Sequence, residues 1–103
     1  KTLFSHPNFS SLSDTLVKNN PETLQRGNAD MGNFADGWPN IMIHDVKETV
    51  EHRDVTYIGD FSEPGNFFSN YAMIRSLVDY YADKVRVIAP YFPVGTMERI
   101  SRK

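Results

Sequence analysis

The sequence contains no cysteine and only three histidines among its 103 residues. Without cysteine, the chain can form neither a disulfide nor a zinc site built on thiolates. His6, His44 and His52 lie far apart and show neither HxxxH nor HxH spacing. Three unrelated histidines at the ends of structural elements are the favoured interpretation, and a metal site made of all three stays open as the alternative. We therefore predict no metal site within the chain.

The chain also lacks an excess of basic residues and a long apolar run. Its 11 lysines and arginines and 13 acidic residues leave a formal net charge of −2, which argues against a nucleic-acid or membrane-surface partner. No apolar run approaches the roughly 18–20 residues that span a bilayer, and no signal-peptide core is visible. With 40% hydrophobic and 23% charged residues, the composition predicts a globular chain, and its length allows at most one domain. The lack of cysteine fits a cytoplasmic location, which we expect.

Hydrophobic patterning predicts the order strand, helix, strand, strand, helix, strand. The expected strands are one that ends near Ser5 and the segments 40–46, 54–61 and 85–92, and the expected helices lie within 8–20 and 63–84. Two intervening segments are polar. Residues 22–33 are expected to form a loop, with a weak strand as an option, and residues 46–53 a connector or short helical turn.

The second expected helix carries the strongest pattern, an apolar stripe over about 15 residues or more. Its members are Phe67, Tyr71, Ile74, Val78 and Tyr81, at spacings of four, three, four and three residues, with Leu77 filling the stripe. Burial of this helix is expected to require contacts with another subunit, because the chain alone would expose much of its apolar surface.

A strand, a long helix and a further apolar strand form a βαβ crossover, which favours a parallel sheet covered by helices. The fold class is therefore predicted to be α/β, in three layers. The last strand, Val85–Phe92, is expected to be buried near the centre of the sheet. In such sheets ligands bind beyond the carboxyl ends of the strands.

The segment NFADGWPN, residues 33–40, is the first candidate for a binding loop. Asp36–Gly37 is a turn signal, and Trp38 is the only tryptophan of the chain. With Phe34 it could grip a planar ring by stacking while Asp36 accepts a hydrogen bond. The alternative is that Phe34 and Trp38 only pin a turn onto the core.

The segment after the last strand is the second candidate. Pro93 and Gly95 break the strand, and hydroxyl and charged side chains follow at Thr96, Glu98, Arg99, Ser101, Arg102 and Lys103. Cations at the end of a parallel strand suit phosphate groups; the alternative is a solvated polar linker. The standard phosphate-binding motifs GxxxxGK[ST] and GxGxxG are absent, and no Ser-His-Asp or Cys-His arrangement can be recognised.

The two loops together resemble one enzyme family. The run FADGWPNIMI, followed about fifty residues later by VRVIAPYFPVGTMERISRK, is similar to ribose-phosphate pyrophosphokinase, also called phosphoribosyl pyrophosphate synthetase. It is most similar to the divergent, plant-type class II branch. The tripeptide SHP near the start matches the first strand-to-helix turn of many members. The resemblance covers nearly the whole chain.

This resemblance implies a type I phosphoribosyltransferase-like fold, with residues 1–103 as part of the N-terminal domain of a two-domain enzyme. The family transfers the diphosphoryl group of ATP to ribose 5-phosphate with Mg²⁺, for nucleotide biosynthesis. The implied partners are ATP, ribose 5-phosphate and further copies of the chain in a homo-oligomer. The metal ligands and the catalytic loop are expected beyond Lys103, so no catalytic residue is expected here and the chain alone is expected to be inactive.

Carried over by position, the ATP-binding residues are Phe34, Asp36, Gly37, Trp38, Thr96, Met97, Glu98 and Arg99. Phe34 would stack on adenine and Asp36 would face the nucleotide, in a pocket completed by a neighbouring subunit. Trp38 stands where the family usually has glutamate. Thr96 and Met97 replace an Arg-Gln pair, whose arginine–phosphate contact is worth about 1.5–3 kcal/mol; Glu98 and Arg99 keep the acidic–basic pair that follows.

Two other functions stay open at this point. The departures at Trp38 and at Thr96–Met97 also fit a non-catalytic regulatory subunit that assembles with catalytic ones. A phosphoribosyltransferase-like domain with unrelated ligands is the third reading. The sequence downstream of Lys103 would separate the first two, because only an active enzyme needs the metal histidine and the loop lysine.

Overall fold

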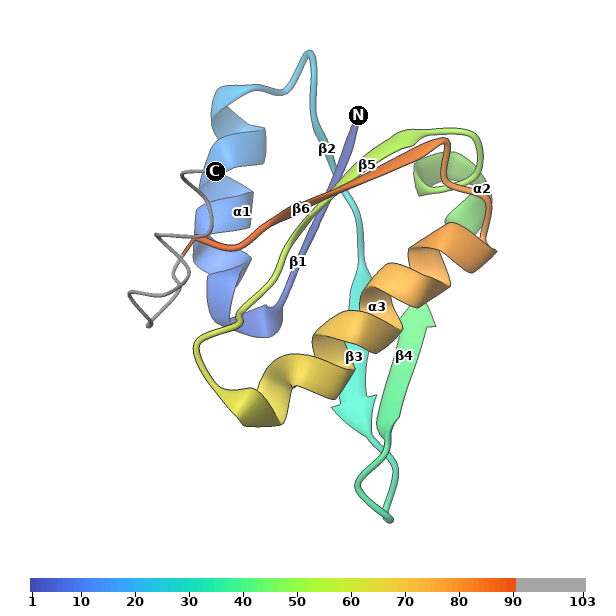
Figure 1. Ribbon diagram of the computed structural model, residues 1–103. Helices are drawn as coiled ribbons and strands as arrows, with labels where there is room; N and C mark the ends of the chain where they lie inside the picture. The colour runs from blue at the N-terminus through green and yellow to red at the C-terminus, as the bar shows by residue number, and fades with distance from the viewer. Residues whose placement is uncertain (91–103) are drawn as a thin grey trace, which may run out of the picture.

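A computed structural model describes residues 1–90 of the chain (Figure 1). The elements follow in this order: β1 (Thr2–Ser5), η1 (Pro7–Phe9), α1 (Ser10–Asn19), β2 (Gln25–Arg26), β3 (Ala29–Asn33), β4 (Pro39–Ile43), α2 (Val46–Thr49), β5 (Asp54–Ile58), η2 (Pro64–Asn66), α3 (Phe67–Asp79) and β6 (Lys84–Ile88). Each of the six predicted strands and helices is present, and two further strands, β2 and β3, lie between α1 and β4. No helix within residues 1–90 is long and apolar enough to cross a membrane.

The main sheet has four parallel strands in the order β2-β1-β5-β6. Figure 1 shows α1 and α3 on either side of this sheet, so the predicted α/β class with helices flanking a parallel sheet is confirmed. From β1 the chain passes through α1 to β2 on one side, and from β5 it passes through α3 to β6 on the other. The point at which the chain reverses direction across the sheet therefore lies between β1 and β5, where ligands bind in many α/β proteins.

Residues 22–33, predicted to be a loop with a weak strand as an option, form strands for most of their length. Residues Gln25–Arg26 form β2, and Ala29–Asn33 form β3, which pairs antiparallel with β4. Strands disfavour the residue types at Asp30, Gly32 and Asn33. The sequence pattern therefore indicates β3 only weakly, and pairing with β4 stabilises the strand. As predicted, Ile41 and Ile43 of β4 are more buried than their neighbours Asn40 and Met42.

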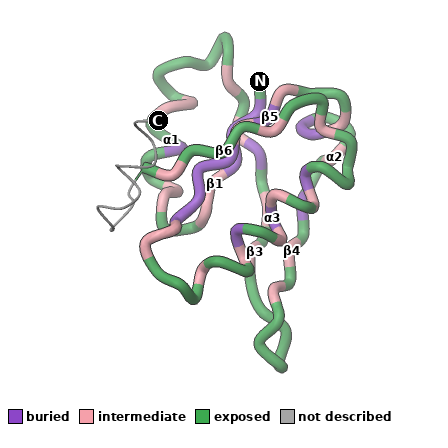
Figure 2. Tube along the Cα trace, viewed as in Figure 1, coloured by how far each residue is buried: buried purple, intermediate pink, exposed green. Residues whose placement is uncertain are grey.

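The core lies between the sheet, the β3–β4 hairpin and α3. It is a single cluster of Phe4, Ile43, Val50, Val55, Tyr57, Met73 and Leu77. The tube in Figure 2 shows the buried stretches concentrated along the central strands β1 and β5. Three further apolar side chains of the hairpin, Ala29, Met31 and Ile41, pack against the cluster, so the small second sheet is attached to the core through its inner face.

The apolar stripe of α3 lies mostly outside the core. The buried residues of the helix are Asn70, Met73 and Leu77. Most of the predicted stripe is instead exposed, with exposed fractions of 61% for Phe67, 60% for Tyr71, 49% for Val78 and 70% for Tyr81. The buried side chain of Asn70 accepts a hydrogen bond from the Tyr57 hydroxyl, and this bond turns the Asn70 face of the helix toward the core. Apolar spacing does not predict this rotation, because it takes no account of polar residues.

The last strand is shorter and more exposed than predicted. β6 spans Lys84–Ile88, pairs only with β5 among residues 1–90, and forms an edge of the sheet. Its side chains Val87 and Ile88 are 44% and 48% exposed. The prediction of a buried, central strand over Val85–Phe92 is therefore wrong for the described part, because no second neighbour covers β6 there.

Candidate functional site

The predicted loop at residues 33–40 forms the tip of the β3–β4 hairpin. The Phe34 amide donates to the Trp38 carbonyl at 2.8 Å, and the Gly37 amide donates to the Phe34 carbonyl at 2.8 Å. Gly37 has φ of +93°, a conformation that other residues rarely adopt. The Asp36 carboxylate accepts from the Trp38 amide at 3.2 Å. The turn thus holds Asp36 in place through one of its two carboxylate oxygens.

Both aromatic rings of this loop are exposed. Phe34 is 55% and Trp38 61% exposed, so the alternative in which both rings only pin the turn onto the core does not fit. Trp38 contacts the ring of Phe68, the second residue of α3, with centroids 6.1 Å apart and an interplanar angle of 65°. Edge-on contacts of this kind stabilise the relative position of two elements, and here they connect the hairpin tip to the start of α3.

Two adjoining cavities flank the contact between Trp38 and Phe68. The first has a volume of about 370 Å³ and is lined by Asn33, Asp36, Gly37, Trp38, Pro39, Gly65, Phe68 and Ser69. The second has a volume of about 320 Å³ and is lined by Trp38, Pro39, Phe68, Tyr71 and Ala72. In Figure 1 the hairpin tip and the start of α3 extend past the end of the sheet at which β1 finishes. The cavities therefore lie on the side where the parallel strands have their carboxyl ends.

A polar cluster lies at the carboxyl ends of β1 and β5. Asp60 accepts from the Asn8 side-chain amide at 2.7 Å and from the Ser62 amide and hydroxyl. These hydrogen bonds, the one from Asn8 first, lower the pKa of Asp60 to about 2. The residue is 7% exposed. It therefore stays ionised at neutral pH and connects the turns that follow the two central strands.

His6 belongs to the same cluster. Its Nδ1 atom accepts from the Asn8 amide at 3.1 Å, which caps η1. Burial lowers the pKa of His6, and the negative charge of Asp60 opposes this shift. His6 is accordingly a structural residue of the turn after β1 at neutral pH.

The buried pair Tyr57 and Asn70 extends this cluster to α3. The Tyr57 hydroxyl donates to the Asn70 side-chain oxygen at 2.5 Å, and the Asn70 amide donates to the Asp60 carbonyl at 2.8 Å. Both side chains are fully buried, and burial raises the pKa of Tyr57. The pair fixes the rotation of α3 and, with it, the position of the aromatic residues at the start of this helix.

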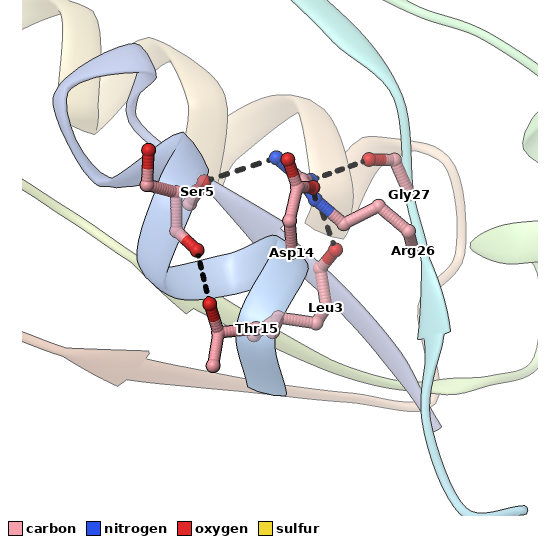
Figure 3. A network of polar contacts seen from close by, with 7 residues as sticks. Leu3, Ser5, Asp14, Thr15, Arg26 and Gly27 are labelled. Atoms are coloured by element: carbon pink, nitrogen blue, oxygen red, sulfur yellow. Dashed lines mark hydrogen bonds and ion pairs between the residues drawn. The ribbon is translucent and has the colours of Figure 1, made fainter. Parts of the chain in front are cut away.

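A third cavity, of about 450 Å³, lies beside β1, β2 and β3. Its lining includes Ser5, Ser10, Arg26 and Asp30. Figure 3 shows the Arg26 guanidinium bonded to Asp14 of α1, to Ser5 and to the carbonyls of Leu3 and Gly27. Because the cation is already paired and hydrogen-bonded within the protein, its main role is to join β2 to α1 and β1.

The described residues do not offer a metal site. No group of three histidine, aspartate or glutamate side chains that could hold an ion occurs in residues 1–90. Instead, His44 Nε2 lies 3.0 Å from Asp30 Oδ2 across the hairpin. His6 belongs to a different cluster, beside Asp60. The prediction that Mg²⁺ ligands lie outside this chain stays a prediction, and no step below depends on the ion.

The structure brings together half of the predicted site. Phe34, Asp36, Gly37 and Trp38 share one hairpin tip. Thr96, Met97, Glu98 and Arg99 lie outside the described residues. Sequence reasoning missed Phe68 and Ser69, because only a long-range contact places them opposite Trp38. The adjacent aromatics at positions 67 and 68 were the one available signal.

The architecture is consistent with a phosphoribosyltransferase-like domain. No protein-family model matches the chain. Among curated proteins it is 26% identical over 98 residues to ribose-phosphate pyrophosphokinase 3, mitochondrial, of Spinacia oleracea, and 29% identical over 98 residues to ribose-phosphate pyrophosphokinase 3, chloroplastic, of Oryza sativa subsp. japonica. Each match covers 95% of this chain and 24% of the relative. A third relative, ribose-phosphate pyrophosphokinase 4 of Arabidopsis thaliana, is 29% identical over 68% of this chain and 20% of its own length.

These matches confirm the resemblance noted in the sequence. The chain is similar to plant ribose-phosphate pyrophosphokinases, at modest identity, over most of its length. It spans about a quarter of the length of the first two relatives. The names of the first two relatives include the words mitochondrial and chloroplastic. These names do not support the predicted cytoplasmic location.

Proposed function

We propose that this protein provides part of the ATP site of a ribose-phosphate pyrophosphokinase. In this proposal the full enzyme transfers the diphosphoryl group of ATP to ribose 5-phosphate and so supplies nucleotide biosynthesis. The observation that carries the proposal is the hairpin tip. Within a chain similar to plant pyrophosphokinases, Asp36 lines a cavity of about 370 Å³ on the carboxyl side of a parallel sheet, and Phe34 is exposed in the same turn.

The contribution of this chain is positioning. The turn holds the Asp36 carboxylate through the Trp38 amide, so an acceptor is already oriented before a ligand binds. An exposed ring on either side of the turn, Phe34 and Trp38, is available for stacking on a planar base. Phosphoryl transfer depends mainly on holding and neutralising phosphates, and Thr96–Arg99 are proposed to contribute to this by their place in the sequence. Mg²⁺ would neutralise phosphate charge when bound elsewhere in the enzyme.

Association with further copies of the chain is part of the same proposal. The exposed side chains Phe67 and Val78 of α3 and Val87 and Ile88 of the β6 edge form apolar surface that soluble monomers usually cover. Residues 1–103 would then be part of an N-terminal domain. The non-catalytic regulatory alternative is not favoured, because the relatives described above are named as pyrophosphokinases.

The test is a coupled assay with ATP, ribose 5-phosphate and Mg²⁺ on the longest natural form of the protein. Formation of phosphoribosyl pyrophosphate that rises with both substrates supports the proposal. A protein that binds neither ATP nor ribose 5-phosphate would refute it. The chain 1–103 alone is expected to bind MgATP weakly and to show no turnover.

A further inference from the structure

The groove between the hairpin and α3 is the feature that the proposed function leaves unused. Its walls are Trp38 and Pro39 on one side and Phe68, Tyr71 and Ala72 on the other. Tyr71, a member of the apolar stripe, is 60% exposed, and Phe68 and Trp38 are 62% and 61% exposed. Three large aromatic side chains thus present accessible surface to one groove.

The size and chemistry of the groove suit one planar ring. Its volume of about 320 Å³ lies at the low end of the roughly 300–1,000 Å³ typical of ligand pockets. Among its five lining side chains, only two carry a polar atom: Tyr71 has a hydroxyl group and Trp38 has Nε1. Rings bind to such walls by stacking and edge contacts, and little directional hydrogen bonding is available.

The groove continues into the cavity at the hairpin tip. Both are lined by Trp38, Pro39 and Phe68, and the cavity at the hairpin tip adds Asn33, Asp36 and Ser69. One Asp36 oxygen accepts from the Trp38 amide, and a carboxylate has capacity for further donors. The joined site therefore offers aromatic walls at one end and acceptors for hydroxyl groups at the other. A nucleoside, with a flat base and a ribose, has this distribution of groups.

The geometry points to Phe68 and Tyr71 of α3 as residues that contact the base of the bound nucleotide, with Trp38 as the opposite wall. This inference rests on the proposed function and adds α3 to the ATP site. The buried pair Tyr57–Asn70 holds the rotation of α3 that turns Phe68 and Tyr71 outward. The base lies in the groove, and the ribose lies toward Asp36.

Trp38 supplies a direct readout, because it is the only tryptophan in the sequence. The chain is titrated with MgATP while the fluorescence of Trp38 is excited where adenine does not absorb. We expect saturable quenching. Replacing Phe68→Ala or Tyr71→Ala weakens binding by about 5- to 150-fold, the range for loss of one base–aromatic contact, and Tyr71→Phe restores it. Tyr80→Ala, at the far end of α3 and 46% exposed, is the matched control and leaves the affinity unchanged.

The outcomes separate this inference from the proposed function. Binding that weakens with Phe34→Ala but is indifferent to Phe68→Ala and Tyr71→Ala overturns the inference and keeps the ATP site. Absence of MgATP binding by the folded chain overturns both. A third outcome is that the fluorescence of Trp38 changes with protein concentration in the absence of ligand and does not respond to MgATP. This result would show that a second copy of the chain occupies the groove, and it also overturns the inference. Circular dichroism of each variant confirms that α3 remains folded.

Discussion

Replacing Asp60→Asn is predicted to destabilise the protein at neutral pH. Asp60 is 7% exposed and accepts hydrogen bonds from Asn8 and from the amide and hydroxyl of Ser62. Asparagine keeps the shape but removes the charge, and its NH₂ group must face one of these donors. The turns after β1 and β5 lose the side-chain bond that joins them.

The expected magnitude follows from the pKa. The folded protein lowers the pKa of Asp60 from 3.8 to about 2, and each unit corresponds to about 1.4 kcal/mol. The ionised carboxylate therefore contributes on the order of 2 kcal/mol. Because the folded pKa is the lower one, this stability is fully present above about pH 5 and is lost as the pH falls toward 2.

Urea denaturation of wild type and Asp60→Asn over a series of pH values tests this reasoning. We expect a gap of about 2 kcal/mol at neutral pH that narrows to roughly half by about pH 3. Asp79→Asn is the control, because Asp79 is 57% exposed and pairs with Arg75 within one helix; it should cost less than about 0.5 kcal/mol. A gap for Asp60→Asn no larger than the control, or one that does not change with pH, would refute the assignment.

Two further pairs of substitutions test the fold and the proposed site. Gly27→Ala would place a methyl group 2.4 Å from the ring of Phe4, so we expect urea denaturation to show about 1–3 kcal/mol of destabilisation. Gly32→Ala is the control: nothing lies within 4 Å of the added methyl group, and the free energy of unfolding should change by less than about 1 kcal/mol. Equal effects of the two substitutions would contradict the close packing at Gly27. In the longest natural form of the protein, Phe34→Ala or Asp36→Ala should raise the KM for ATP about tenfold, the effect of roughly 1.4 kcal/mol of lost binding. The KM for ribose 5-phosphate should stay nearly unchanged. Steady-state kinetics with each substrate varied in turn measure both constants, and equal changes in the two would count against the assigned pocket.

Local patterns predicted the elements better than their partners. The alternation in residues 40–43 and the turn signal Asp36–Gly37 correctly indicated a strand and a tight turn, because both depend on nearest neighbours. β3 could be predicted only as an optional weak strand, because its residues have low strand propensity and its stability comes from pairing with β4.

The candidate site was half predictable for the same reason. The exposed loop with Phe34 and Asp36 could be recognised from its residues, but the wall at Phe68 and Tyr71 could not. It depends on which face of α3 turns inward, and a buried amide at Asn70 decides this against the apolar spacing. A buried hydrogen bond between segments 13 residues apart leaves no trace in hydrophobic periodicity.

The most direct test of the central claim is a two-dimensional amide NMR spectrum of the chain recorded with increasing MgATP. The account predicts saturable shifts in two segments, the hairpin tip at residues 33–39 and the start of α3 at residues 65–72, while the amides of β1 stay unmoved. Shifts that instead surround Arg26 and the cavity beside β2, or a spectrum that does not change at all, would contradict the assignment of this hairpin to an ATP site.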